Sequence, residues 1–249
     1  MEKIILLLHG FGEDHRIFEK QIAALSKKHT VLAPDLPGSG ILNQHNWEAG
    51  TETIDWLAWW VNEFLESKGI EKCIMLGHSM GGYITLSFAE QYPEKLEAFG
   101  LIHSTAYADT EEKKETRQKA ISFMEEKGPF TFLKTAIPGL FGPIFSAKNP
   151  EIIAALVEDA KAFSLPSLTA YYRAIMARPE RTHVLEDLQI PILLVAGSDD
   201  QAVPIADLLQ QASVPVVGHF HILKDVGHMG MLEAFDELNT ILLNFITSV

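Results

Sequence analysis

The sequence predicts an α/β fold, a mostly parallel sheet of about six strands with helices on both of its faces. Short apolar runs alternate with helix-length amphipathic segments along the 249 residues, as expected for a parallel sheet that is covered on both sides. The length suits one domain with a sizeable core, or one domain that carries a large insertion. Hydrophobic residues make up 47% and charged residues 21% of the chain, which is ordinary for a soluble globular protein.

Six short apolar runs are expected to form the strands, and five amphipathic segments are expected to form the helices. The segment 53–67 shows the helical pattern, because Ile54, Leu57 and Val61 recur with a period near 3.6 and Gly69 follows as a stop signal. We expect strands at residues 4–8, 30–33, 73–76, 99–103, 192–196 and 219–223, and helices at residues 15–27, 53–67, 80–91, 205–211 and 231–247.

Residues 104–186 interrupt this alternation, since they contain several helical patterns and no convincing strand. Asn149 followed by Pro150 is a helix start, and the stretch 128–145 is unusually aromatic and apolar for a surface excursion. An insertion of this size beside a sheet is typical of a lid over a binding site. We therefore expect a core of residues 1–103 and 187–249 and a helical lid of residues 104–186.

The net charge of −13 argues against two classes of partner. With 33 acidic and 20 basic residues, the surface repels phosphate backbones and anionic lipids, so neither nucleic-acid binding nor a membrane-surface function is expected. The first apolar run is too short for a signal-peptide core or a membrane span, which favours a cytoplasmic location. The single cysteine, Cys73, allows no intramolecular disulfide and is expected to be a buried structural thiol.

The motif Gly-His-Ser-Met-Gly at residues 77–81 has the form of a nucleophile elbow. The motif follows a predicted strand and precedes a predicted helix. The tight turn between them lifts the hydroxyl of Ser79 away from the backbone. Gly77 and Gly81 stand two positions either side of Ser79, where side chains would collide. Ser79 is therefore the candidate nucleophile.

Attack on a carbonyl places negative charge on its oxygen, which backbone N–H groups can stabilise if they are aimed at it beforehand. Met80 offers one such group at the start of a helix, whose dipole favours an anion there. The loop at residues 9–12, after the first strand, should supply the second, with Phe11 as the natural donor next to Gly10.

Three motifs together make the chain resemble the α/β-hydrolase superfamily, in its serine hydrolase branch with a helical lid. They are His-Gly-Phe-Gly at residues 9–12, Asp-Leu-Pro-Gly-Ser-Gly at residues 35–40 and the elbow at residues 77–81, and they follow in the family's order. The resemblance covers the chain except for the insertion. One departure is that the family's leading hairpin is not recognisable.

The resemblance implies a catalytic triad in the order serine, acid, histidine. Among ten histidines, His228 follows Gly227 in a loop after the last predicted strand, and we assign it as the base. The loop after residue 196 contains Asp199 and Asp200, and the family spacing selects Asp200 as the acid, with Asp199 as the alternative. His219 and His221 have no companion ligands at useful spacing, so no metal site is expected.

These residues predict acyl transfer through an acyl-enzyme, with no cofactor. The apolar insertion indicates a small-to-medium carboxylic ester with an apolar portion, and His103, Phe130, Phe141 and Phe145 are the candidate pocket residues. The same triad also serves lactonases, thioesterases, carbon–carbon bond hydrolases and pyruvate-eliminating lyases, which remain alternative functions. A non-catalytic small-molecule receptor on the same fold is the alternative from another functional class. The arginines at positions 173, 178 and 181 could bind a carboxylate, but we expect them to be solvated. The oligomeric state is left open.

Overall fold

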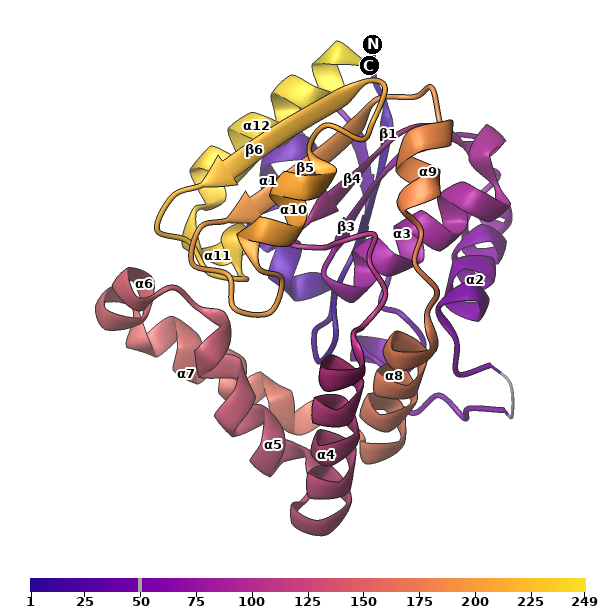
Figure 1. The fold of residues 1–249 in the computed structure, drawn as a ribbon. Helices are drawn as coiled ribbons and strands as arrows, with labels where there is room; N and C mark the ends of the chain where they lie inside the picture. The colour runs from indigo at the N-terminus through magenta and orange to yellow at the C-terminus, as the bar shows by residue number, and fades with distance from the viewer. Residues whose placement is uncertain (49–50) are drawn as a thin grey trace.

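The computed structural model describes residues 1–48 and 51–249, and a six-stranded sheet runs through its centre (Figure 1). The strands lie in the order β2-β1-β3-β4-β5-β6, and each neighbouring pair is parallel, so the predicted fold class is confirmed. The strands are β1 (Ile4–Leu8), β2 (Thr30–Leu32), β3 (Cys73–His78), β4 (Leu96–Ile102), β5 (Ile192–Gly197) and β6 (Gly218–Leu223).

The strand order creates a switch point beside β1. The chain passes from β1 to the edge strand β2 and then returns to the other side of β1 as β3. The loops that leave β1 and β3 therefore diverge at the carboxyl ends of these neighbouring strands, where open α/β sheets form their binding crevices. Leu8 pairs with Gly77 in the register of β1 and β3, which brings the residues after both strands to the same level.

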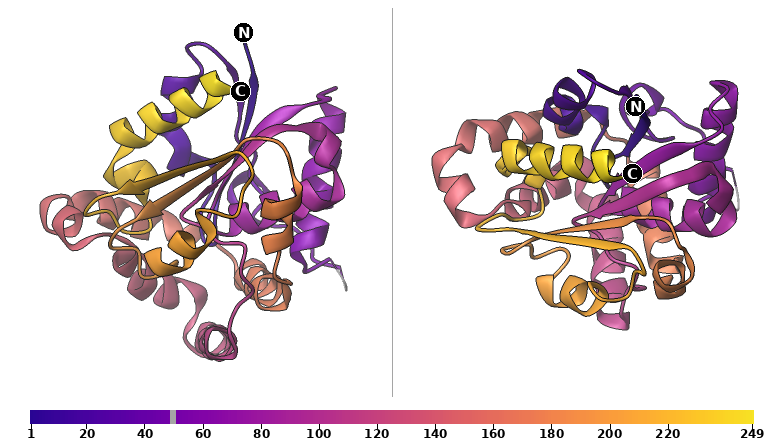
Figure 2. Two further views of the ribbon diagram at one scale, coloured as in Figure 1. Left: turned by 45° about the horizontal axis from the view of Figure 1, so that its top comes forward. Right: turned by 90° about the horizontal axis from the view of Figure 1, so that it is seen from above.

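Helices cover the two faces of the sheet (Figures 1 and 2). On one face α1 (Glu19–Leu25) packs against α12 (Phe235–Ser248), and on the other α2 (Ile54–Ser67) packs against α3 (Met80–Gln91). The other face also carries α9 (Thr182–Asp187), which contacts α3, and α10 (Ile205–Gln211), which contacts β5. Cys73 is fully buried in this core, and burial raises the pKa of its thiol to about 12.

Two expected helices differ in detail from the structure. The segment expected at 15–27 starts as a 3-10 turn, η1 (His15–Phe18), because the Asp14 side chain accepts the N–H of Arg16 and holds the first turn tight. The segment expected at 231–247 is split at Ala234 into α11 (Gly230–Glu233) and α12, since the Glu233 carboxylate is turned back to accept backbone N–H groups from the loop before α11.

Five further helices lie beyond the carboxyl ends of the strands (Figure 1). They are α4 (Glu111–Lys127), α5 (Pro129–Ala136), α6 (Pro143–Lys148), α7 (Pro150–Asp159) and α8 (Leu165–Ala177). Helix α9 belongs to the same expected insertion but packs against α3. The division into a core and a lid of residues 104–186 stays a prediction.

The arginines after α8 correct one expectation. Arg178 and Arg181 are buried rather than solvated, with side chains 4% and 5% exposed. Arg181 bonds Asp55 on α2 and Glu90 on α3, so it ties α9 to the core, whereas the half-exposed Arg173 meets Glu52. In the described ranges every helix is too short or too polar to serve as a membrane span.

Candidate active site

Ser79 occupies the sharp turn between β3 and α3. Its backbone has φ 51° and ψ −116°, a conformation that is strained for a residue with a side chain. Three hydrogen bonds hold it there: Ser79 N–H donates to the carbonyl of Ile102 at 3.0 Å, and its own carbonyl accepts from Gly82 N at 2.9 Å and from Ser104 Oγ at 2.7 Å. The strain is therefore fixed by β4 and by the first turn of α3.

Gly77 and Gly81 allow this turn to pack closely. A Cβ on Gly77 would lie 2.3 Å from the carbonyl oxygen of Gly81, and a Cβ on Gly81 would lie 2.1 Å from the carbonyl oxygen of Leu8. Neither contact can be relieved by moving a side chain, because the obstacle is backbone. The glycines therefore bring the N-terminus of α3 against the end of β1.

Asp200 and His228 meet at the ends of β5 and β6. Asp200 Oδ2 accepts from His228 Nδ1 at 2.8 Å, while Oδ1 accepts the backbone N–H groups of Ala202 and Val203 at 2.9 Å each. Burial raises the pKa of Asp200, but the charge of His228 and the hydrogen bonds from histidine hold it well below its usual range. Asp199 points elsewhere, and its carboxylate accepts from Ser198 Oγ at 3.1 Å.

The same Asp200 oxygen lies 3.3 Å from Nδ1 of a second histidine, His103. This side chain is fully buried, and burial lowers its pKa to about 4, so it is neutral at physiological pH. Its Nδ1 therefore carries a proton and donates to Asp200. Its backbone φ is 50°, and its Nε2 has no hydrogen-bond partner among the described residues. His103 and His228 thus contact the same carboxylate oxygen of Asp200.

Burial lowers the pKa of His228, but the Asp200 carboxylate and its hydrogen bond outweigh burial and raise it above the usual histidine value. Because Nδ1–H donates to Asp200, Nε2 is the nitrogen left to accept a proton. The backbone of His228 is held on both sides: its N–H donates to the Leu140 carbonyl at 2.6 Å, and its carbonyl accepts from His78 Nε2 at 3.0 Å.

Glu13 joins the loops that follow β1 and β3. Its Oε2 accepts from Gly10 N at 2.6 Å and from His78 Nδ1 at 2.9 Å. Burial opposes ionisation of Glu13, but the charge and hydrogen bond of His78 outweigh it, so the pKa of this carboxyl is lowered. Since His78 Nε2 reaches the carbonyl of His228, one buried network links the loop at residues 9–13, the elbow and the histidine loop.

His9 fixes the other side of the first loop. Leu36 N–H donates to His9 Nε2 at 3.0 Å, so the proton of the neutral ring is on Nδ1 and is donated to the Gly10 carbonyl at 2.9 Å. Burial lowers the pKa of His9, which keeps this tautomer neutral. Two buried histidines, His9 and His78, thereby hold the loop that carries Phe11.

Ser79 and His228 line the same cavity of about 160 Å³. Phe11, Tyr172 and Arg117 share its wall, and the Phe11 and Tyr172 rings stack with centroids 4.1 Å apart. Between the described side chains of Ser79 and His228 no hydrogen bond is formed. The remaining wall is largely apolar and includes Phe132, Leu133, Ile137, Leu140, Leu156 and Ile175.

The four residues expected to line the pocket lie elsewhere. His103 contacts Asp200, whereas Phe141 and Phe145 stack on each other with centroids 5.4 Å apart and Phe130 lies under the ammonium of Lys161. None of them is among the described residues that line the cavity. Residues 104–186 do supply much of the apolar wall, from α5, α7, α8 and the turn Ile137–Leu140.

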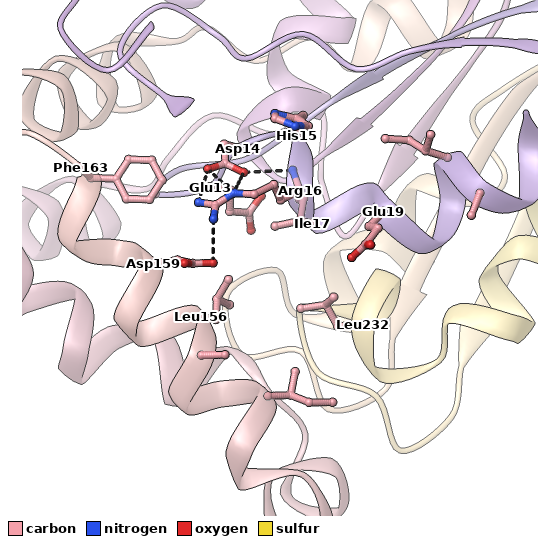
Figure 3. A pocket seen from close by; sticks show the side chains of 15 residues that line it. Glu13, Asp14, His15, Arg16, Ile17, Glu19, Leu156, Asp159, Phe163 and Leu232 are labelled. Carbon is pink, nitrogen blue, oxygen red and sulfur yellow. Dashed lines mark hydrogen bonds and ion pairs between the residues drawn. The ribbon is translucent and has the colours of Figure 1, made fainter. Parts of the chain in front are cut away.

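A larger groove of about 710 Å³ opens beside this cavity, between η1, α1 and α7 (Figure 3). Gly12, Glu13 and Leu156 line both spaces, so the groove adjoins the cavity. Arg16 reaches across it from η1, bonding Asp14 on its own side and Asp159 at 3.0 Å on α7. The rest of the groove is mostly apolar.

Two groups of described side chains place potential metal ligands within 4.8 Å of one another. One consists of His103, Asp200 and His228, in which Asp200 Oδ2 is taken up by hydrogen bonds from both rings. The other consists of Asp14, His15 and Asp35, in which Asp35 Oδ1 lies 2.7 Å from His15 Nδ1. In both groups the carboxylates are engaged in hydrogen bonds within the protein, whereas His103 Nε2 in the first group has no partner among the described residues.

Comparison with known proteins gives consistent likenesses. A family model described as "Alpha/beta hydrolase family" matches residues 5–241. An esterase from Thermogutta terrifontis superposes with a TM-score of 0.92 at 24% identity, covering 100% of this chain and 90% of that chain. An enol-lactonase from Burkholderia xenovorans superposes with a TM-score of 0.89 at 22% identity, covering 99% and 92%. These two likenesses show a shared fold.

A curated relative extends beyond the region of similarity. The dihydrolipoyllysine-residue acetyltransferase component of the acetoin cleaving system of Cupriavidus necator is 25% identical over 242 residues. The match covers 96% of this chain but only 62% of that protein. The chain therefore spans less than two thirds of this relative's length.

The close packing of α3 on β1 is tested by Gly81→Ala. The added methyl group would overlap the Leu8 carbonyl, so we expect the free energy of unfolding in urea to fall by about 1–3 kcal/mol, as for other overpacked sites. Gly139→Ala is the matched control, because no atom lies within 4 Å of the methyl group it adds. Equal stability of the two variants would contradict the packing described for the elbow.

Proposed function

The chain belongs to the alpha/beta hydrolase family, and from this premise we propose that it is a serine hydrolase that cleaves a small-to-medium carboxylic ester through an acyl-enzyme. The observation that carries the proposal is the shared cavity: Ser79 on its strained turn faces the same space as His228, whose Nδ1 is bonded to Asp200. A nucleophile, a base and a residue that orients the base are the components that acyl transfer needs.

In the proposed first step, His228 Nε2 takes the proton of Ser79 as Oγ attacks the substrate carbonyl. Asp200 contributes by holding the ring with its proton on Nδ1 and by stabilising the imidazolium that forms. The two backbone N–H groups on Asp200 Oδ1 keep the carboxylate ionised and oriented while this charge develops.

The negative charge on the substrate oxygen is stabilised, in this proposal, by the backbone N–H groups of Phe11 and Met80. Met80 begins α3, where an N–H has no acceptor within its own helix and the helix dipole favours an anion. Phe11 follows Gly10, whose N–H is held by Glu13 and whose carbonyl is held by His9. Groups fixed before the reaction need no reorganisation during it.

Collapse of the tetrahedral intermediate releases the alcohol, which receives the proton from His228. The acyl group is then an ester of Ser79. A water molecule, deprotonated by the same histidine, attacks this ester and releases the acid, which returns Ser79 to its hydroxyl form. Each proton therefore passes through His228 Nε2.

The apolar wall of the cavity supports an acid or alcohol part with little polarity. The likeness to the Thermogutta esterase favours an open-chain ester, and the likeness to the Burkholderia enol-lactonase brings in a lactone as the second candidate. Turnover of esters and lactones with matched acyl chains decides between these two substrate classes. They differ for the enzyme because the alcohol of a lactone stays attached to the acyl group after the ring opens.

The role of Ser79 is tested by Ser79→Ala on p-nitrophenyl butyrate. We expect kcat/KM to fall by at least about 10³-fold, since the acyl-enzyme can no longer form. Ser87→Ala is the control, because Ser87 is a buried serine of the same helix whose hydroxyl bonds Asp55. Unchanged turnover by Ser79→Ala would refute the proposed function.

The pH profile tests the acid and the base together. Because His228 works as a base only when neutral and its pKa is raised, we expect kcat/KM to fall on the acid side with a midpoint above about 6.5. Asp200→Asn removes the charge that raises this pKa, so the midpoint should move to lower pH and kcat should drop by about 10³- to 10⁴-fold.

Asp199→Asn is the matched control for this experiment, since it changes the neighbouring aspartate and leaves the His228 partner in place. It should retain both the rate and the midpoint of wild type. The reverse pattern, with Asp199→Asn inactive and Asp200→Asn normal, would assign the acid to Asp199.

A further inference from the structure

One charged side chain in the wall of the catalytic cavity has no part in the proposed mechanism. Arg117 lies on α4, in a stretch of helix that is otherwise polar and exposed, yet its side chain is only 23% exposed and it lines the same cavity as Ser79 and His228. It is the single lysine or arginine among the described residues that line this cavity. A cation in a small and largely apolar cavity requires a counter-charge.

The protein supplies only part of that counter-charge. Arg117 Nε donates to Asp109 Oδ2 at 2.6 Å, but the same carboxylate also meets Arg178, whose Nη1 lies 2.9 Å from Oδ1. Asp109 is 1% exposed, so one buried carboxylate faces two guanidinium groups that are both charged at any physiological pH. The cluster of these three residues therefore carries one unbalanced positive charge.

Glu13, the acidic residue among the described residues that line the cavity, does not offset this charge. Glu13 is already paired with His78 and holds the N–H of Gly10. Arg178 cannot turn toward the cavity, because it donates to the carbonyls of Ile175 and Tyr107 and stacks at 3.8 Å on Tyr83. Arg117 is thus the member of the cluster that faces the cavity.

Aromatic stacking fixes Arg117 relative to the reaction centre. Its guanidinium lies 5.3 Å from the centroid of Tyr172, and Tyr172 stacks in parallel on Phe11. The ring of Tyr172 therefore contacts both the cation and the ring of Phe11, the residue whose backbone N–H is proposed to bind the oxyanion. Because Arg117 and Ser79 line the same cavity of about 160 Å³, one small substrate can reach both of them.

We propose that the cavity accepts an ester or lactone whose acid part carries a carboxylate, and that Arg117 binds this carboxylate. This inference rests on the proposed function of Ser79 and names the substrate class of that site. The acid part is the one concerned, because in an ester and a lactone alike it becomes attached to Ser79 within the small cavity. The alcohol of an ester must leave, and the larger adjoining groove offers it a path. The overall charge of −13 does not oppose this binding, since distant surface charges are screened beyond about 8 Å at physiological salt.

Two substrates of equal chain length test the proposal: mono-p-nitrophenyl glutarate, which carries a carboxylate, and p-nitrophenyl valerate, which does not. In Arg117→Gln we expect kcat/KM for the glutarate ester to fall by about 10- to 100-fold, mainly through KM, and that for the valerate ester to change by less than about threefold. Free glutarate should inhibit hydrolysis of the valerate ester competitively in wild type. Its inhibition constant should be higher in Arg117→Gln by the same factor as the loss of kcat/KM for the glutarate ester.

The ratio of the two rates is independent of how much protein is folded, because both substrates report on the same active molecules. Arg173→Gln is the matched control, since it removes a half-exposed arginine on α8 that meets Glu52 outside the cavity, and it should leave the ratio at the wild-type value. Rates are corrected for spontaneous hydrolysis measured without protein.

An equal loss on both esters in Arg117→Gln would overturn the proposal, as would a wild-type enzyme that hydrolyses the valerate ester but neither hydrolyses the glutarate ester nor is inhibited by glutarate. The same shift of the ratio in Arg173→Gln would also overturn it. The variant Ser79→Ala distinguishes failure of the proposed function from failure of the substrate assignment. If Ser79→Ala remains active, the proposed function is wrong. If it is inactive but the ratio of the two rates is unchanged in Arg117→Gln, only the substrate class is wrong.

Discussion

The contact between the first turn of α3 and the last residue of β1 is the constraint on which the site depends. Gly81 has no side chain, so the backbone of α3 can lie where a Cβ would be 2.1 Å from the Leu8 carbonyl. This contact sets the turn that carries Ser79 directly beside the loop that leaves β1. The strain at Ser79 is tolerated because β4 and α3 both bond its backbone.

From this contact a buried polar network extends to the other loops of the site. Glu13 binds Gly10 and His78, and His78 in turn binds the carbonyl of His228, so three loops from different strands share one set of hydrogen bonds. Buried charges contribute little net stability, because desolvation offsets their attraction. We infer that this network instead specifies the relative positions of the loops, which is what a reaction centre requires.

Much of the architecture could be predicted from the sequence because it depends on local patterns. The apolar runs and the glycines around Ser79 are determined by neighbours along the chain, and they led to the sheet and to the elbow. The cavity wall could not be predicted in this way. Arg117 stands among charged residues of a polar helix, and only the fold shows that it lies against Tyr172 rather than in solvent.

The same limit explains the residues whose positions were unexpected. The aromatic character of Phe141 and Phe145 predicts pocket positions, but the turns between short helices decide which face an aromatic ring occupies, and here the two rings stack on each other. Arg178 and Arg181 resembled surface charges because their partners lie far away in sequence, on α2, on α3 and in the segment before α4. Periodicity carries no information about such distant pairs.

In the proposed mechanism Ser79 carries the acyl group during turnover. The most direct test is to quench the wild-type protein with acid during hydrolysis of p-nitrophenyl butyrate and to analyse its peptides by mass spectrometry. We expect a butyryl group on the peptide that contains Ser79, located on Ser79 itself after fragmentation. A butyryl group on another residue, or full turnover with no modified peptide at any quench time, would contradict this mechanism.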